Sequence, residues 1–500
     1  MTESRAVVIG AGIAGLSAAI DLARRGLAVT VVERASGPGG KMREVEIEGR
    51  FIDSGPTVFT MPWVFEELFA DAGSALHDQV EVEPAGVLAR HAWRDGSRLD
   101  LHAEPDRSAQ AIEDFAGRAE AVRYREFCQQ AQQIYRTLYQ PFMRSQRPSP
   151  FSLIKASGWR GLADLWRIRP FQSMWSRLGQ LFHDPRLRGL FGRYATYCGS
   201  SPLLAPATLI LVAHVEQRGV WRVAGGMQRL AEAMVSLFEQ LGGTIRFDSR
   251  VSEIELRNGS VSGVELESGE RLPADIVVAN TDCASIGAGL LGSGTSTAVP
   301  KPKPGRRSLS AVTWSLLAET SGFDLDHHNV FFPDDYPQEF IDIFRHRRLP
   351  THPAVYICAQ DRCRPAADPD QHERLFLITN APASGDHDRF DRRVVQPVEE
   401  AVFELLESCG LRVSCPPERR VVTTPADFEK RFPGTGGALY GESSHGWMAS
   451  FSRPGARSRI PGLYLAGGSI HPGPGVPMVA ISGRLAADAA AADLGLAGPR

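Results

Sequence analysis

The chain has 500 residues, a formal net charge of −3 at pH 7, 43% hydrophobic residues and 23% charged residues. These values are ordinary for a globular protein with a large core, and they give no reason to expect a nucleic-acid partner. The seven cysteines are scattered without a CxxC pair or a metal-ligand spacing, which predicts reduced thiols, no metal site and a cytoplasmic location. No stretch approaches the roughly 20 apolar residues of a membrane-spanning helix.

The N-terminal residues predict a strand, a glycine turn, a helix and a second strand. An apolar run over 6–9 leads into GAGIAG at 10–15, and a helical pattern follows until Gly26. A second β-branched run over 29–32 ends at Glu33. This order around a GxGxxG turn is typical of the dinucleotide-binding βαβ unit, whose helix N-terminus binds phosphates.

Each residue type in this unit has a physical reason. Gly10 permits the tight turn, Gly12 lets the backbone approach a pyrophosphate, and Gly15 lets the helix pack closely on the strand. Glu33 can accept hydrogen bonds from ribose hydroxyls and disfavours the 2′-phosphate of NADP. The alternative is a βαβ turn that binds nothing. The residues expected to bind the cofactor here are Gly10, Gly12, Ala14, Gly15 and Glu33.

A second glycine turn decides between NAD and FAD. Gly39-Gly40-Lys41 follows Glu33 after a short loop and can bring a cation to the same pyrophosphate. Simple NAD dehydrogenases lack this extension, so the predicted cofactor is FAD, with contacts from Gly40 and Lys41.

The middle of the chain alternates between strand-like and helical segments. Residues 79–101 and 244–278 predict strands, and residues 106–217 are mostly helical. Residues 286–307 are rich in Gly, Pro and Ser and predict a crossover to a second domain. The polar residues 361–391 predict surface loops.

The C-terminal residues predict a strand, a glycine turn and a helix. An apolar run over 462–466 ends in Gly467-Gly468, the constrained loop 469–478 follows, and an alanine-rich helix is expected over 479–493. A helix N-terminus after such a turn can face an anionic ligand atom, so we expect contacts from Gly468, Val476 and Met478. The alternative is a strand and helix packed on the core without a ligand.

These motifs together resemble the phytoene desaturase family, the bacterial carotenoid desaturases of the FAD-dependent amine oxidase-like superfamily. The resemblance rests on the two N-terminal glycine turns, on DSGPT at 53–57, on the middle segment 219–227 and on GLYLAGGSIHPGPGVPMVAISG at 462–483. It covers both ends and the centre of the chain. It implies further FAD contacts from Gly55, Pro56, Thr57 and Val251.

Within the family, residues 439–448 and the loop 471–478 are most similar to the 1-hydroxycarotenoid 3,4-desaturases, or hydroxyneurosporene desaturases. This similarity implies that a hydride is abstracted and a C3–C4 double bond is introduced into a 1-hydroxylated acyclic carotenoid, with oxygen or a quinone as electron acceptor. The alternative is a phytoene desaturase that forms neurosporene or lycopene. An FAD-dependent amine oxidase and a prenyl-lipid-binding protein like the GDP-dissociation inhibitors are further alternatives.

No strong catalytic motif is present, and the catalytic residues stay unassigned. Asp53 and His471 flank the expected flavin segments as candidate bases, each with a structural role as the alternative. His445 and Ser444 are candidates for contact with a substrate hydroxyl.

The predicted fold class is α/β, with a Rossmann-type FAD-binding domain assembled from discontinuous segments, an α+β substrate domain and a helical subdomain that faces the membrane. The expected FAD-binding segments are 1–75, 218–284 and 431–500, the helical segment is 76–217 and the substrate domain is 285–430.

A basic and aromatic stretch runs from Arg144 to Arg193, with only two acidic residues. Its composition is typical of an interfacial helix that places aromatic rings and cations at anionic lipid headgroups. We therefore expect peripheral association with the inner face of the cell membrane. The alternative is a helical subdomain that buries its aromatic residues against the core.

Overall fold

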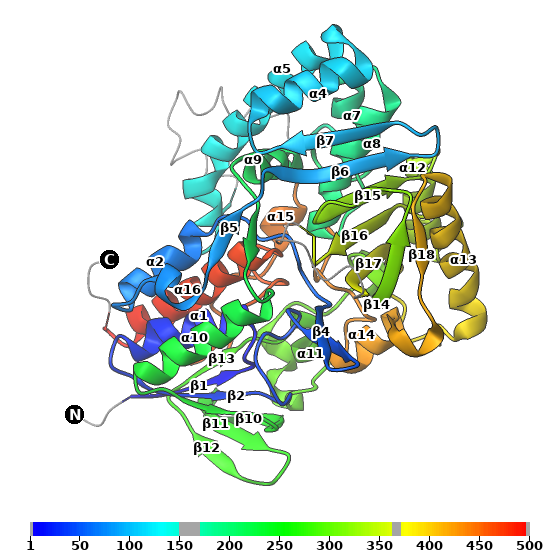
Figure 1. The fold of residues 1–500 in the computed structure, drawn as a ribbon. Coiled ribbons are helices and arrows are strands. Elements are labelled where there is room, and N and C mark those ends of the chain that lie inside the picture. Colours follow the sequence, from blue (N-terminus) through cyan, green and yellow to red (C-terminus); the bar gives the residue numbers. More distant parts are fainter. Residues whose placement is uncertain (1–3, 150–170, 363–371, 497–500) are drawn as a thin grey trace.

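The computed structural model describes residues 4–149, 171–362 and 372–496 (Figure 1). Its first sheet is parallel, with five strands in the order β20–β13–β1–β2–β9. These strands are β1 (Arg5–Ile9), β2 (Ala28–Val32), β9 (Thr244–Arg246), β13 (Ile276–Ala279) and β20 (Leu463–Leu465). Neighbouring strands come from distant parts of the chain, which confirms the prediction of a Rossmann-type sheet assembled from discontinuous segments.

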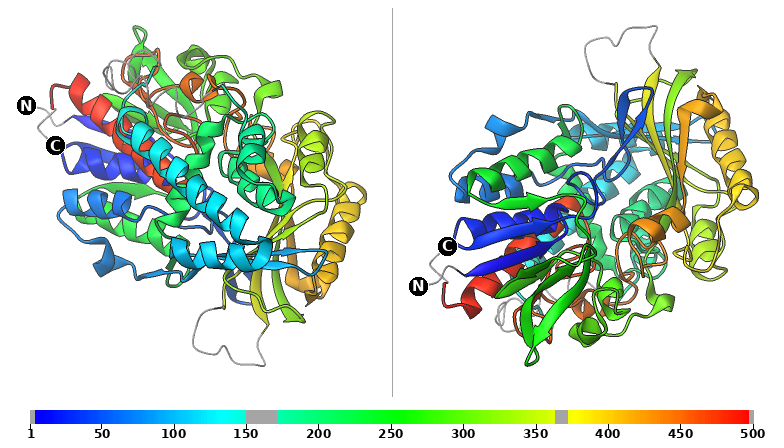
Figure 2. Two further views of the ribbon diagram at one scale, coloured as in Figure 1. Left: turned by 90° about the horizontal axis from the view of Figure 1, so that it is seen from above. Right: turned by 90° about the horizontal axis from the view of Figure 1, so that it is seen from below.

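Helices cover one face of this sheet, and a small antiparallel sheet covers the other (Figures 1 and 2). On strand β1, Ala6 and Val8 belong to the core with the helices, whereas Val7 and Ile9 belong to the core with the small sheet. Alternate side chains are therefore buried on both faces, as expected for a parallel strand. The covering elements are α1 (Ile13–Ala23), α10 (Gln228–Gln240) and α16 (Val476–Asp493) on one face, and β10 (Val251–Arg257), β11 (Ser260–Leu266) and β12 (Arg271–Pro273) on the other.

The second sheet has eight strands and is mostly antiparallel, in the order β18–β14–β17–β16–β15–β6–β7, with β19 also pairing with β14. Helix α13 (Arg392–Ser408) covers its outer face, where Val402 and Leu405 share a core with Trp314 and Leu377. The other face is turned toward the interior of the molecule. The strands are β6 (Val87–Trp93), β7 (Arg98–His102), β14 (Ser310–Ser321), β15 (His328–Phe332), β16 (Val355–Ala359), β17 (Glu373–Ala381), β18 (Arg412–Ser414) and β19 (Arg420–Thr423).

A helical layer closes the space between the two sheets. The ring of Phe127 lies 5.4 Å from that of Phe182 and 4.5 Å from that of Phe191, centroid to centroid. Phe182 and Phe191 therefore fill a protein core, which corrects the prediction of an interfacial role for them, because their neighbours bury them completely. The layer contains α4 (Pro105–Ala116), α5 (Arg118–Leu138), η1 (Tyr139–Met143), α7 (Met174–Leu181), α8 (Pro185–Gly192), η2 (Arg193–Cys198), η3 (Ala207–Ile210) and α9 (Leu211–Gln217).

Much of the basic and aromatic stretch, including Phe151, Trp159 and Trp166, falls on residues 150–170 and lies outside the described residues. Within the described ranges, no helix combines the length and the apolar character that crossing a bilayer requires.

Two local predictions are corrected. Strand β17 is central in the second sheet, so the prediction of surface loops over 361–391 is wrong for these residues. The apolar run 375–378 is short and follows charged residues, which hides its alternation in the sequence. Helix α16 begins at Val476 and not at Val479, because Pro477 is tolerated in a first helical turn.

Short elements connect these parts of the molecule. They are β3 (Glu44–Ile47), β4 (Arg50–Asp53), α2 (Trp63–Asp71), α3 (Leu76–Gln79), β5 (Val82–Pro84), β8 (Trp221–Val223), α11 (Cys283–Gly287), η4 (Ser293–Ala298), η5 (Pro304–Arg306), α12 (Tyr336–Phe344), η6 (Pro417–Arg419), α14 (Pro425–Arg431) and α15 (Ala449–Ser452).

Candidate functional site

A cavity of about 1430 Å³ extends between the first sheet, the second sheet and the helical layer. Its volume exceeds the roughly 300–1,000 Å³ of a pocket for one small ligand, so it has room for a dinucleotide and a second, long ligand. Every predicted cofactor residue except Gly15 lines it, namely Gly10, Gly12, Ala14, Glu33, Gly40, Lys41, Gly55, Pro56, Thr57, Val251, Gly468, Val476 and Met478.

The two N-terminal glycine turns lie against each other at one end of the cavity. The N–H of Gly39 donates to the carbonyl oxygen of Ala11 at 2.9 Å. A Cβ at Gly12 would lie 2.7 Å from Oδ1 of Asn280, and a Cβ at Gly40 would lie 3.2 Å from Cα of Gly12. Because neither position has room for a side chain, the backbone stays open to phosphate oxygens at the N-terminus of α1.

Gly15 lies one helical turn further along. A Cβ there would lie 2.0 Å from the carbonyl oxygen of Gly10. The residue thus permits the close approach of α1 to the turn and does not face a ligand.

The carboxylate of Glu33 is fixed at the end of β2, where it lines the cavity. Oε2 accepts a hydrogen bond of 2.7 Å from the N–H of Ala11, and Oε1 accepts one of 2.8 Å from the N–H of Ala35. A carboxylate oxygen has a further lone pair, so both oxygens can still accept from ribose hydroxyls. The donors and acceptors at this end of the cavity therefore fit the ADP half of FAD.

Lys41 connects the second glycine turn to the C-terminal part of the chain. Its Nζ donates to the carbonyl oxygen of Leu439 at 2.6 Å and lies 5.2 Å from the centroid of the Phe432 ring. Burial lowers the pKa of Lys41, and the charge of Asp282 opposes this shift. Its contact with a pyrophosphate stays a prediction.

The N-terminus of α16 faces the cavity through Val476, Pro477 and Met478. Gly475 precedes the helix with a φ of 115°, a conformation that other residues rarely adopt. The first turn contains no acidic residue, so the helix dipole and the free N–H groups are available to a negatively charged ligand atom.

Arg453, which the sequence did not reveal as a site residue, holds the loops around this helix start. Its side chain is buried, and its Nη1 donates to the carbonyl oxygens of Tyr440 at 3.1 Å and Gly468 at 3.0 Å. Its Nη2 donates to the carbonyl oxygen of Glu442 at 2.8 Å. No motif surrounds Arg453 in the sequence, and its partners become apparent only in the folded chain.

The two candidate bases have structural hydrogen bonds. Oδ2 of Asp53 accepts from the N–H of Met227 at 2.9 Å, and burial raises the pKa of this carboxyl. Nε2 of His471 donates to the carbonyl oxygen of Phe142 at 2.8 Å, and burial lowers the pKa of His471 to about 4. Neither residue is among those that line the cavity, which favours the structural interpretation for both.

Of the two candidates for a substrate hydroxyl, Ser444 lines the cavity and His445 does not. Nε2 of His445 accepts from the N–H of Ser201 at 3.0 Å, and its ring packs against Phe344. Burial lowers the pKa of His445 to about 4, so the ring is neutral near pH 7. His445 therefore positions the loop, and Ser444 is the one that can reach a ligand.

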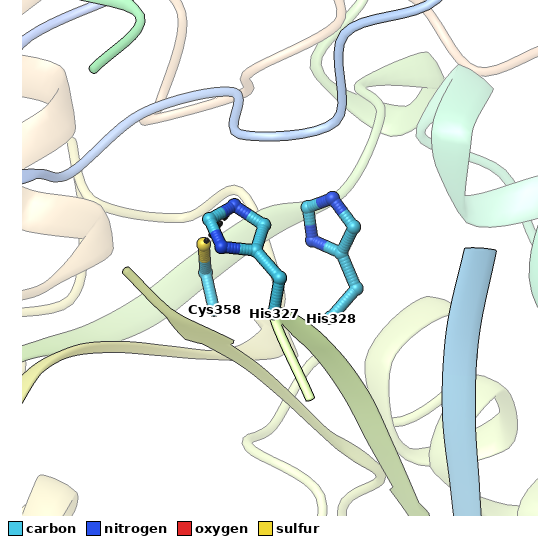
Figure 3. Close-up of side chains that lie close together, drawn as sticks. All are labelled: His327, His328 and Cys358. Atoms are coloured by element: carbon cyan, nitrogen blue, oxygen red, sulfur yellow. Dashed lines mark hydrogen bonds between the residues drawn. The ribbon is translucent and has the colours of Figure 1, made fainter. Parts of the chain in front are cut away.

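Pairing of β15 with β16 creates a cluster that sequence spacing could not reveal. His328 lies opposite Cys358, and the side-chain N and S atoms of His327, His328 and Cys358 lie within 4.8 Å of one another (Figure 3). Nδ1 of His328 shares a hydrogen bond of 2.7 Å with the hydroxyl of Tyr356. Burial raises the pKa of the Cys358 thiol, so the thiol is protonated near pH 7 in the metal-free protein. The three side chains are hydrogen-bonded to protein groups, as polar residues in a protein interior usually are.

The other end of the cavity is largely apolar. Helices contribute Leu138 and Val212, and the inner face of the second sheet contributes Val330 and Ile378. Apolar side chains make up most of these walls, so this end suits a long apolar ligand.

Comparison with known proteins agrees with this geometry. A family model described as flavin containing amine oxidoreductase matches residues 13–491. Hydroxyneurosporene desaturase of Rubrivivax gelatinosus is 52% identical over 491 residues, 98% of this chain and 94% of that protein. The 1-hydroxycarotenoid 3,4-desaturase of Flavobacterium sp. (strain P99-3) is 31% identical, over 97% of this chain and 98% of that protein.

The fold is shared with solved structures as well. An oxidoreductase from Methanosarcina mazei matches with a TM-score of 0.62 at 17% identity, covering 96% of this chain and 99% of that one. The similarity to the two desaturases and the match to the family model confirm the predicted relationship to carotenoid desaturases. The chain belongs to the flavin-containing amine oxidoreductase family, and its cofactor is FAD.

Proposed function

We propose that the protein introduces the C3–C4 double bond into a 1-hydroxylated acyclic carotenoid such as 1-hydroxyneurosporene. The observation that carries this proposal is the 52% identity over 98% of the chain to a hydroxyneurosporene desaturase. The apolar walls of the cavity support it, because a polyene offers little else to bind.

FAD supplies a hydride acceptor when it is bound, and the proton lost from the neighbouring carbon goes to a base or a water molecule that we leave unassigned. Gly12 and Gly40 leave space for its pyrophosphate, and Glu33 accepts hydrogen bonds from its ribose. The N-terminus of α16 favours the negative charge that develops on the reduced ring. These assignments use groups that all face one cavity.

The apolar walls align the substrate and exclude water from it. Conjugation makes loss of hydride next to a polyene favourable, so alignment contributes more than acid–base catalysis. Side chains from the helical layer and from the second sheet line this space, among them Val212 and Val330. A rigid conjugated chain held between two such walls can place one bond beside the cofactor.

We also propose that the cavity opens toward the inner face of the cell membrane. Two exposed residues that line the cavity, Phe171 and Trp447, form with Leu204 and Met448 what we call the entrance cluster. Met448 follows Trp447 in the chain, and the carbonyl oxygen of Leu204 accepts from the N–H of Gly446. The rings of Phe171 and Trp447 lie 5.0 Å apart, and both residues line the cavity. Such a cluster gives a lipid-dissolved substrate a path that avoids water. Oxygen or a membrane quinone would then accept the electrons.

Carotenoid analysis in engineered cells tests the reaction. The chain is co-expressed in cells that make only phytoene and in cells that make 1-hydroxyneurosporene, and the extracts are separated by chromatography. We expect one added double bond on the hydroxylated carotenoid and little conversion of phytoene. Accumulation of neurosporene or lycopene from phytoene would move the assignment to the phytoene desaturases.

A further inference from the structure

Arg193, the first residue of η2, is a buried cation that lies near the buried Glu216 and has no salt bridge to any residue that the structure describes. Its side chain is 8% exposed and lines the cavity. Among residues 4–149, 171–362 and 372–496, no carboxylate oxygen lies within 4.0 Å of its guanidinium, and its Nε has no hydrogen-bond partner. Burial lowers the pKa of Arg193, but Tyr197 and the buried carboxylate of Glu216 outweigh this and raise it, so the positive charge is stabilised. What stays unsatisfied is the buried Nε–H, and a buried donor without a partner is costly. The position therefore calls for a further partner.

Aromatic rings hold the guanidinium of Arg193 in place. Its Cζ lies 5.8 Å from the ring centroid of Tyr194 and 5.3 Å from that of Tyr197. The hydroxyl of Tyr197 donates to Oε1 of the buried Glu216 at 3.1 Å, so this carboxylate already has a partner. A guanidinium carries five N–H donors, and interaction with the Tyr197 oxygen leaves several of them for a ligand.

The surroundings of Arg193 place it on the cofactor side of the apolar space. Its charge acts on the hydroxyl of Tyr356, and that hydroxyl shares a hydrogen bond of 2.7 Å with Oγ1 of Thr57. Thr57 belongs to the segment that we assign to FAD. In a 1-hydroxylated carotenoid the oxygen is only three bonds from C3. A group that recognises this hydroxyl must therefore lie close to the cofactor, and Tyr356 connects Arg193 to Thr57, which we assign to FAD.

We propose that Arg193 donates a hydrogen bond to the 1-hydroxyl oxygen of the substrate and so selects hydroxylated over non-hydroxylated carotenoids. This inference rests on the proposed function and names a specificity residue for it. A charged donor makes a stronger hydrogen bond than a neutral one. A substrate without the hydroxyl covers the guanidinium with hydrocarbon and leaves it unpaired, which penalises that substrate.

Arg193→Met tests the proposal, with Arg188→Met as the matched control. The guanidinium of Arg188 also lies over an aromatic ring, 4.1 Å from the centroid of Trp175, but Arg188 does not line the cavity. The values of kcat/KM are measured for 1-hydroxyneurosporene and for neurosporene. If neurosporene is not converted, its inhibition constant against 1-hydroxyneurosporene is used instead.

We expect Arg193→Met to lower kcat/KM for 1-hydroxyneurosporene about 10- to 100-fold and to leave the affinity for neurosporene unchanged or improved. Arg188→Met should leave the ratio of the kcat/KM values for the two substrates as it is in the wild type. Arg193→Met should lower the melting temperature, because the buried Glu216 loses a neighbouring positive charge, but the folded protein should keep its FAD. An arginine with a structural role alone would change kcat/KM for both substrates alike on substitution.

The proposal is overturned if folded Arg193→Met keeps the wild-type ratio of kcat/KM for 1-hydroxyneurosporene to kcat/KM for neurosporene. It is also overturned if Ser444→Ala loses the discrimination between the two substrates and Arg193→Met does not. If Arg193→Met does not fold, Arg193→Gln tests the same ratio with a polar side chain. The proposed function fails by a separate result, a wild-type protein that does not convert 1-hydroxyneurosporene.

Discussion

Arg453 donates a hydrogen bond of 3.0 Å to the carbonyl oxygen of Gly468, in the turn that follows the last strand of the parallel sheet. The same guanidinium donates to the carbonyl oxygens of Tyr440 and Glu442. One buried side chain therefore fixes two chain segments that border the cavity.

We expect Arg453→Ala to lower the free energy of unfolding by about 2–4 kcal/mol, because three partly buried carbonyl groups lose a charged donor. The dissociation constant of FAD should rise at least about tenfold as the turn at Gly468 loosens. Urea unfolding and a flavin fluorescence titration measure the two effects. Arg457→Ala, which removes a half-exposed partner of Asp493, is the control and should cost about 1 kcal/mol or less. An unchanged FAD affinity in Arg453→Ala would contradict the role given to this residue.

Gly12→Val should abolish FAD binding in a folded protein. Gly12 has a φ of −72°, so a side chain causes no backbone strain there. Its Cβ would meet Oδ1 of Asn280 at 2.7 Å, and the remaining methyl groups would occupy the space above the start of α1. Flavin absorbance reports binding, and circular dichroism reports folding. Gly86→Val, at a position with nothing within 4 Å of a Cβ, is the control. Retained flavin in folded Gly12→Val would count against this binding site.

Stability should fall between about pH 6.5 and pH 4. Burial lowers the pKa of His471 to about 4, whereas an unfolded histidine titrates near 6.5. In this range the unfolded chain binds more protons than the folded one, so the free energy of unfolding decreases as the pH falls, by about 1.4 kcal/mol per pH unit for one such group. Below pH 4 this contribution stays constant.

His471→Gln should flatten this slope by the same amount, because its amide can still donate to the carbonyl oxygen of Phe142 and does not titrate. Urea unfolding at pH 7.5, 6 and 5 measures it. FAD-dependent activity per bound flavin should be retained in this variant. A complete loss of this activity at pH 7.5 would instead indicate that His471 is a catalytic base.

Membrane contact should depend on the entrance cluster. The wild type is expected to sediment with anionic liposomes, and more weakly at high salt, because salt screens the attraction of basic residues to the lipid. Trp447→Glu should weaken sedimentation, since a charge would enter the lipid interface. Val394→Glu, an equally exposed apolar position on α13, should not. A wild type that stays in the supernatant at low salt contradicts the membrane proposal.

The sequence predicted those parts of the site in which a short segment determines its own turn. The glycines at 10–15 and 39–40, Glu33 and the loop 469–478 are each readable within a short segment, and nearly all of the predicted cofactor residues line one cavity. The parallel sheet was predicted because its strands are short, apolar and bounded by turns.

Residues whose role depends on distant partners could not be predicted. Arg453 has no local signature, since the carbonyl groups around it come from other segments. The rings beside Arg193 belong to its own segment, but its place at the cavity depends on the fold. His328 and Cys358 become neighbours only through strand register. His471 was ambiguous for a similar reason, because Phe142, its partner, lies in another part of the chain.

The topology of the parallel sheet has a consequence for biosynthesis. Strand β1 is made first, but it lies between β2 and β13, and β20 beyond β13 comes from residues 463–465. During translation one edge of β1 stays unpaired until β13 has left the ribosome. Helix α16, which completes the cofactor site, is synthesised last. A nascent chain can therefore not be stabilised by FAD, and an open strand edge is a site of aggregation. The interval between the synthesis of β1 and that of β13 is therefore the stage at which we expect the chain to aggregate most readily.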